Sequence, residues 1–203
     1  MISWIVASHR PDVLAGNLAA TLRVETSDEL VVVEDPPSIA VAYNQGQAKA
    51  VNQLRVYVHS DVRILDMHRL RAQLLRRCAI TVGMVGIIGS REPIVPWWVG
   101  TTCGSVIDAR MGVIDRGGGG ACSYLDGLLL ATVHDLTWDE SYSGFHLYDH
   151  DICQQMLAQG LLNLCLSDGA QMVLHNTSNS TDTSRLDGWD EGMARFRQKW
   201  STP

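Results

Sequence analysis

The N-terminal part of the chain alternates short apolar runs with stretches of helical periodicity. Residues 3–7 and 30–34 are apolar and β-rich, and each run is followed by polar or turn-forming residues, as in the buried strands of a parallel sheet. A helix is predicted over residues 11–21, where Pro11 suits a first helical turn and leucines recur every fourth residue from Leu14. Strand, helix and strand in this order begin an α/β fold.

The same alternation continues to the end of the chain. The spacing of apolar residues predicts a helix over 38–54, a strand over 55–61 that ends in a polar cluster, a surface helix over 66–77 and a strand over 80–89. Residues 93–124 are rich in glycine and contain Pro96, which favours loops and a hairpin. Further elements are predicted as a strand over 125–132, a helix over 147–160, short strands over 162–166 and 172–175, and a polar tail from 176 with a helix over 189–200.

Composition and length agree with one globular domain spanning residues 1–203, with a mostly parallel central sheet flanked by helices. Hydrophobic residues make up 46% of the chain, but no apolar run approaches the roughly 20 residues that span a bilayer. The N-terminus does not resemble a secretory signal. An odd number of scattered cysteines without a Cys-x-x-Cys pair favours free thiols and a cytoplasmic setting: Cys78, Cys103, Cys122, Cys153 and Cys165.

A polar cluster, His59-Ser60-Asp61, closes the strand predicted over residues 55–61. Open α/β sheets bind ligands outside the carboxyl ends of their strands. A carboxylate there can hold Mg²⁺ or Mn²⁺ against a diphosphate, because both ions accept carboxylate and phosphate oxygens. The competing interpretation is structural: Asp61 caps the next segment, and His59 is a surface or core histidine.

A second cluster opens the helix predicted over residues 147–160 and carries Asp149 and Asp151. Acidic residues in a first helical turn interact favourably with the helix macrodipole, which is the structural interpretation. The functional interpretation is that one of these carboxylates, Asp149 first and Asp151 second, removes a proton from an attacking acceptor hydroxyl.

A third candidate is His175, on the last predicted strand. Neutral imidazole is a good ligand for transition-type divalent metals, although a lone histidine is also common as a structural residue.

Taken in order, these motifs resemble the glycosyltransferase family 2-like group. The matching segments are 38–46, 56–62, 125–127, 145–153 and His175 with Ser178. The resemblance covers most of the chain and implies a GT-A fold, which is the Rossmann-like fold of nucleotide-diphospho-sugar transferases. It also implies a metal-dependent, inverting enzyme that uses Mn²⁺ or Mg²⁺, a nucleotide-diphospho-sugar donor with UDP-sugars favoured, and a hydroxyl acceptor such as a saccharide.

The resemblance implies roles for individual residues. Asp61 and His175 would hold the metal, with His59 in the place of the first carboxylate of the family's Asp-x-Asp motif. Asp149 would be the base, with Tyr148 in the place of its usual acidic neighbour. Contacts to the donor are implied for Ala7, Ser8, Glu34, Tyr43, Asn44, Ser60 and Asp126.

Two features near the predicted acceptor side have open roles. Trp97, Trp98 and Trp138 could stack on a sugar or a base, or pack in the core or in a lid. The glycines of residues 117–120 fall in the predicted loop region, where mobile covers of active sites are commonly built.

Three alternatives remain at this point. Arginines at positions 69, 71, 76 and 77 could face phosphate if the acceptor is a hydroxymethylated base in DNA, but the net charge of -6 opposes nucleic-acid binding. A non-catalytic nucleotide-sugar-binding module is suggested by His59. A sugar-nucleotide-forming nucleotidyltransferase ranks last, since residues 7–12 lack the glycines of a phosphate loop.

Overall fold

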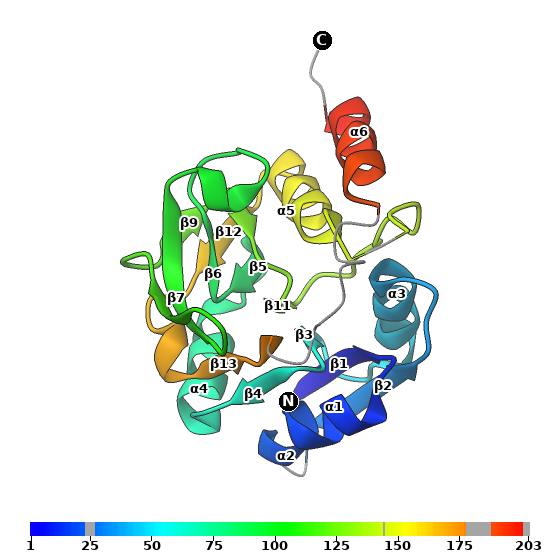
Figure 1. Cartoon of the computed structure of the whole chain (residues 1–203), viewed down its shortest axis with the longest axis vertical. Helices are drawn as coiled ribbons and strands as arrows, with labels where there is room; N and C mark the ends of the chain where they lie inside the picture. The colour runs from blue at the N-terminus through cyan, green and yellow to red at the C-terminus, as the bar shows by residue number, and fades with distance from the viewer. Residues whose placement is uncertain (23–26, 144, 178–187, 201–203) are drawn as a thin grey trace.

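The computed structural model describes residues 1–22, 27–143, 145–177 and 188–200, which form two β-sheets with helices packed against them (Figure 1). The helices are α1 (Pro11–Gly16), α2 (Leu18–Thr21), α3 (Ile39–Lys49), α4 (Met67–Arg77), α5 (Tyr148–Ala158) and α6 (Trp189–Trp200), with the short 3₁₀ turns η1 (Trp97–Val99) and η2 (Gly169–Gln171). The strands are β1 (Ile2–Ser8), β2 (Glu29–Glu34), β3 (Leu54–His59), β4 (Val62–Ile64), β5 (Val82–Gly86), β6 (Ile88–Ser90), β7 (Thr102–Asp108), β8 (Gly112–Asp115), β9 (Gly120–Cys122), β10 (Tyr124–Leu125), β11 (Leu129–Thr132), β12 (Leu162–Cys165) and β13 (Val173–His175). Among these helices, none reaches the length and apolar character of a membrane-spanning segment.

The first sheet has the strand order β2-β1-β3-β11-β5-β12-β9. Strands β2, β1, β3, β5 and β12 run in one direction, and β11 and β9 run in the other. Helix α3 packs on β1 and β2, α4 packs on β5, and α5 packs on β5 and β12. The predicted α/β class with a mostly parallel central sheet is therefore confirmed, and the apolar strands lie in its core because both faces are covered.

The second sheet has the order β10-β6-β7-β13-β4, with β8 paired to β7. The chain passes from the first sheet to the second at two places. One is the turn of Ser60 and Asp61 between β3 and β4, and the other is Ile87 between β5 and β6. Strand β13 returns late in the chain and lies between β7 and β4. The carboxyl end of β3 is thereby brought beside the end of β13.

Two predicted strands were wrong as continuous elements. Residues 80–89 form β5 and β6 in different sheets, and residues 125–132 are split by a turn over residues 126–128. The run over 80–89 is almost uniformly apolar and carries no polar residue that marks its bend, whereas the break in the run over 125–132 falls at Asp126 and Gly127, an Asp-Gly pair typical of turns. A Cβ on Gly127 would lie 1.9 Å from the Tyr148 hydroxyl, so the turn requires glycine.

Two further predictions were right in outline and wrong in detail. The helix predicted over 11–21 is interrupted at Asn17, whose buried side-chain amide donates to the carbonyl of Val13 at 2.8 Å. The loop-and-hairpin region over 93–124 contains the β7–β8 hairpin, but β7 is also an inner strand of the second sheet. Its alternation was obscured by the glycines around it.

Asn163 of β12 ties three parts of the core together. Its amide donates to the carbonyls of Ser123 and Cys153 at 3.0 Å each, and its oxygen accepts from the backbone N–H of Met84 at 3.1 Å. The side chain is completely buried. We expect Asn163→Ala to lower the free energy of unfolding by roughly 3 kcal/mol or more, because each buried group left without a partner costs about 1–3 kcal/mol. Urea denaturation measures this change.

Gln159→Ala is the matched control, since Gln159 is an exposed amide at the end of α5. The control should unfold at the wild-type urea concentration. Equal midpoints for both variants and the wild type would mean that water replaces the three bonds of Asn163.

Candidate functional site

The backbone register of three strand pairs places several of the predicted site residues next to one another at the ends of the strands. Ala7 of β1 lies opposite His59 of β3, and Ser8 lies opposite Glu34 of β2. In the second sheet, Val62 of β4 lies opposite His175 of β13. Because Asp61 directly precedes Val62, this pairing brings Asp61 beside His175.

His59, Asp61 and His175 form a cluster that is able to hold a metal ion. One possible ligand atom from each lies within 4.8 Å of the other two. His175 Nε2 is 3.4 Å from Asp61 Oδ1, and the rings of the two histidines have centroids 5.8 Å apart. All three side chains are partly buried. Two imidazoles and a carboxylate are a donor set that divalent cations accept, so these residues fit the metal implied by the family resemblance.

The charges around the cluster favour a positive charge at His175. Burial alone would lower the pKa of His175, but Asp61, Asp126 and Asp108 outweigh it and raise that pKa. Burial likewise opposes the charged form of Asp61, yet the hydrogen bond and charge of His175 lower the pKa of Asp61. Burial lowers the pKa of His59, which keeps that imidazole in the neutral form that binds metals.

Asp126 and Asp149 form a second pair of acidic groups beside the cluster. The N–H of Gly127 donates to Asp149 Oδ2 at 3.1 Å, which joins the β10–β11 turn to the start of α5. Burial and the charge of Asp149 raise the pKa of Asp126. For Asp149 the effect of burial is outweighed by His150, whose ring nitrogen lies 2.8 Å from Asp149 Oδ1, and the pKa is lowered. Paired carboxyl groups with pKa values moved apart are typical of sites that divide acid and base roles.

The start of α5 has an unusual backbone. Leu147, at its N-cap, has a φ of 65°, which is rare for a bulky residue. The next residue, Tyr148, is buried, and its hydroxyl lies 2.7 Å from His59 Nε2. The strained turn therefore aims Tyr148 at the cluster, and such strain is found most often at functional sites.

Asp151, the second catalytic candidate, faces α6 instead of the histidine cluster. Its carboxylate accepts from Trp200 Nε1 at 2.7 Å and Lys199 Nζ at 2.9 Å. Gln155 and Tyr142 donate to the same carboxylate. The side chain is almost fully buried, so its contacts are those of an anchor for α6.

The predicted donor-binding residues divide into two groups. Ala7, Ser60, Asp126 and exposed Glu34 line the strand ends and the turn, and buried Ser8 has an Oγ without a hydrogen-bond partner among the described residues. Tyr43 and Asn44 lie deeper. Tyr43 is fully buried, and the Asn44 amide is bonded to the backbone of Trp138 and to Glu140.

The tryptophans have different surroundings. Trp138 is 1% exposed and packs against Tyr43 and Tyr57 with ring centroids 4.9 Å apart in both cases, so it is part of the floor under the site. Trp98 is 56% exposed and contacts the ring of Trp189. The side chain of Trp97 and all of Ser178 lie outside the described residues.

The four-glycine segment is tied to the second sheet. Arg91 donates to the carbonyls of Gly118 and Gly119 at 2.7 and 3.2 Å. A Cβ on Gly119 would lie 2.2 Å from the carbonyl oxygen of Cys165, so this segment rests directly on the backbone of β12.

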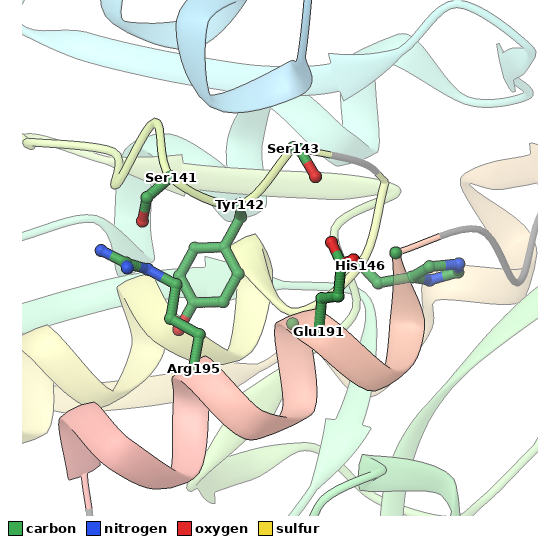
Figure 2. Close-up of a pocket in the computed structure, with 8 residues that line it drawn as sticks. Ser141, Tyr142, Ser143, His146, Glu191 and Arg195 are labelled. Atoms are coloured by element: carbon green, nitrogen blue, oxygen red, sulfur yellow. The ribbon is translucent and has the colours of Figure 1, made fainter.

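Two cavities flank α6. One of about 170 Å³ lies between residues 141–143 and α6, with Tyr142, His146 and Arg195 in its wall (Figure 2). A wider one of about 610 Å³ is lined by Asn44, Trp138 and Lys199 among others. His59, Asp61 and His175 do not line either of these two cavities, whereas the predicted site residues Asn44 and Trp138 line the second one.

Asp108 is a residue that sequence reasoning missed. It ends β7 opposite His175, its Oδ2 lies 3.8 Å from His175 Nδ1, and Thr177 donates to both of its oxygens at 3.1 Å. Its position at the end of an apolar strand, followed by a turn, repeats the pattern of Asp61. That pattern is the available signal, and the glycines of residues 93–124, which predict a loop region, obscure it.

Comparisons with known proteins bear on the family and on the fold of the chain. The model of a glycosyltransferase-like family matches residues 17–189, which is most of the chain. S. aureus TarS 1-349 has a similar structure, with a TM-score of 0.62 and 12% identity over 98% of this chain and 64% of TarS. The mannosyltransferase PcManGT from Pyrobaculum calidifontis, in complex with GDP-Man and Mn²⁺, gives a TM-score of 0.57 and 13% identity over 100% of this chain and 65% of that one.

These likenesses confirm the predicted GT-A-like fold. The chain spans less than two thirds of the length of both structures. Among curated proteins, none matches the sequence.

The surroundings of Asp151 generate a prediction. We expect Asp151→Ala to lower the free energy of unfolding by roughly 3 kcal/mol, because Trp200 loses its buried acceptor and Lys199 loses one of two carboxylates. Urea denaturation measures the change, and limited proteolysis should cut α6 faster in the variant.

Asp12→Ala is the matched control, since Asp12 forms a surface pair with Arg10. Its stability should equal that of the wild type. An Asp151→Ala protein with wild-type stability and no catalytic turnover would return Asp151 to the catalytic candidates.

Proposed function

Because the chain belongs to the glycosyltransferase-like family, we propose that it transfers a sugar from a nucleotide-diphospho-sugar to a hydroxyl group of a saccharide-type acceptor. The observation that carries this proposal is the convergence of His59, Asp61 and His175 with the carboxyl groups of Asp126 and Asp149. These residues come from distant parts of the chain. His59, Asp61, Asp126 and His175 lie at or just after the carboxyl ends of strands, where open α/β sheets bind ligands, and Asp149 in the first turn of α5 is hydrogen-bonded to the turn that follows Asp126.

The nucleoside diphosphate is proposed to lie along the ends of β1 and β3. Ser8 supports this placement, because its buried hydroxyl lacks a partner and can bond to a polar group of the ligand. Glu34 at the end of β2 is exposed and positioned for a nucleoside contact. Tyr43 belongs to the layer of buried rings under the site, since its ring contacts Trp138 and Tyr148.

His59, Asp61 and His175 are the residues that would hold a divalent cation. When bound, the cation neutralises negative charge that develops on the departing nucleoside diphosphate, which is often the largest catalytic effect. Asp108 orients His175 from the opposite side of its ring, as a carboxylate commonly does for a metal-binding histidine.

Asp149 is the proposed base. Its lowered pKa keeps the carboxylate ionised, so it can accept the proton of the acceptor hydroxyl as that oxygen attacks. Asp126, whose pKa is raised, keeps its proton to higher pH and can donate a hydrogen bond to a hydroxyl of the donor sugar. A single displacement with this arrangement inverts the anomeric carbon.

Two observations bear on the nucleoside base of the donor. The sequence resemblance favours UDP-sugars, whereas the complex of PcManGT contains GDP-Man and Mn²⁺. A DNA acceptor has less support than a saccharide, because Arg69 pairs with Asp168 and Arg71 with Asp28. The guanidinium groups of these two arginines therefore form ion pairs within the protein.

We expect the protein to release nucleoside diphosphate from one member of a panel of UDP-, GDP-, ADP- and dTDP-sugars, and chelation of divalent metal by EDTA should abolish the release. Asp61→Ala and Asp149→Asn should each lower turnover by about 100-fold or more, since metal-assisted charge stabilisation and general-base help each contribute at least that factor. A coupled assay for the released nucleoside diphosphate measures turnover, with and without saccharides and hydroxymethylated DNA as acceptors.

His68→Ala is the control, because His68 is an exposed histidine on α4 outside the cluster. It should retain wild-type turnover. If no donor is hydrolysed or transferred, and calorimetry detects no donor binding, the glycosyltransferase proposal fails; donor binding without turnover would instead favour a nucleotide-sugar-binding module.

A further inference from the structure

The metal site has a donor set that differs from a carboxylate pair. It combines imidazoles from His59 and His175 with the single carboxylate of Asp61. Asp126 and Asp149 are close enough to influence the pKa of His59, but they do not belong to the cluster of ligand atoms. The set therefore combines two imidazole nitrogens with one carboxylate oxygen.

The contact of Tyr148 decides which nitrogen of His59 is available. Nε2 lies 2.7 Å from the Tyr148 hydroxyl. A neutral imidazole has one N–H donor and one nitrogen with a lone pair. If Nε2–H donates to the phenol oxygen, Nδ1 keeps its lone pair for a cation, which is how second partners commonly fix the tautomer of metal-binding histidines.

Tyr148 is held firmly in this position. It is the residue after the strained Leu147, it is buried, and its ring contacts Tyr43 and Trp138. Gly127 leaves the space for its hydroxyl, since a Cβ there would lie 1.9 Å from that oxygen. The phenol is thus a fixed partner that orients His59 and adds no negative charge.

His175 has a matching arrangement. Its Nε2 faces Asp61, and its Nδ1 faces Asp108 at 3.8 Å. Each histidine therefore presents one nitrogen to a partner that fixes the ring and leaves the other for the ion. The two partners differ in charge, because Asp108 is a carboxylate and Tyr148 is a phenol.

Ligand chemistry then discriminates between ions. Mg²⁺ prefers carboxylate, phosphate and water oxygens, whereas imidazole is a common ligand of zinc and of iron, nickel and copper. Mn²⁺ also accepts oxygen ligands and stands at the weak end of the first-row series, in which Co²⁺ and Zn²⁺ bind more tightly. We propose that the His59–Tyr148 pair makes this site select Mn²⁺, Co²⁺ or Zn²⁺ over Mg²⁺, with His59 as the ligand that sets the preference and Tyr148 as its positioning residue. The inference deepens the proposed function, and direct binding of the ion tests it without any donor, so the two can fail separately.

The experiment measures dissociation constants of the full chain for MnCl₂, CoCl₂, ZnCl₂ and MgCl₂ by calorimetry. Mn²⁺ should bind at least about tenfold more tightly than Mg²⁺ to the wild type. His59→Asp should bring the Mn²⁺ and Mg²⁺ constants close together by strengthening Mg²⁺ binding. Tyr148→Phe should weaken Mn²⁺ binding by about tenfold, the lower end of the loss seen when a partner of a metal ligand is removed.

Pulsed electron paramagnetic resonance of bound Mn²⁺ gives a second measurement. The wild type should show hyperfine coupling to two imidazole nitrogens, and His59→Asp should show coupling to one. His68→Asp makes the same substitution at an exposed histidine, and Tyr124→Phe removes a phenol whose partner is Gln154. Both controls should bind Mn²⁺ as the wild type does.

Several outcomes would overturn the inference. Equal Mn²⁺ and Mg²⁺ affinities in the wild type would do so, as would coupling to a single imidazole or a Mn²⁺ to Mg²⁺ ratio unchanged by His59→Asp. Absence of ion binding would also overturn the inference about ion selectivity. If such a protein still released nucleoside diphosphate in the presence of EDTA, the glycosyltransferase proposal would stand without a metal. If His59→Asp does not fold, the wild-type ratio, the nitrogen coupling and Tyr148→Phe still decide the question.

Discussion

The site depends on the register between two three-residue strands, β4 and β13. Val62 lies opposite His175, the N–H of Asn176 donates to the Asp61 carbonyl at 2.9 Å, and the N–H of Leu65 donates to the Met172 carbonyl at 2.7 Å. Hydrogen bonds at both ends of so short a ladder hold the pairing in place. Since a shift by one residue turns every side chain to the other face of a sheet, it would remove His175 from Asp61 and dissolve the cluster.

A layer of buried aromatic rings beneath the β4–β13 pairing strengthens the electrostatic interactions between the charged groups of the site. Tyr43, Tyr57, Trp138 and Tyr148 form a contiguous group of buried rings. Such a group excludes water, and charges interact more strongly where the local dielectric constant is low. The raised pKa of Asp126 and the paired charges of Asp61 and His175 are consequences of this setting.

Much of the fold could be predicted from the sequence, because most elements have a clear period or clear ends. Helices α3, α4, α5 and α6 and strands β1, β2, β3, β12 and β13 fall where the patterns indicate, although the helix predicted over 38–54 ends at Lys49 and Leu54 already belongs to β3. The break at Ile87 could not be predicted, since residues on both sides are equally buried and apolar.

Site residues could be predicted where a carboxylate or histidine follows a strand. They could be predicted less well where packing between distant segments decides which side chains come into contact. His59, Asp61 and His175 do come together as the motifs indicated. Asp151 and Trp138 belong to the same chemical types as site residues, but the docking of α6 and the aromatic floor give them other contacts. The position of Asp108 beside His175 depends on strand pairing, and the contact of Tyr148 with His59 depends on how α5 packs; periodicity reveals neither.

The docking of α6 has a consequence for any shortened form of the chain. Phe196 on this helix covers Tyr124 and His150, and the bare Gly192 lets the helix approach Leu147. A form that ends before α6 would therefore expose these apolar surfaces to water and leave an uncovered apolar patch beside the turn that orients Tyr148. Self-association, rather than a smaller version of the same molecule, is the expected result of such a deletion.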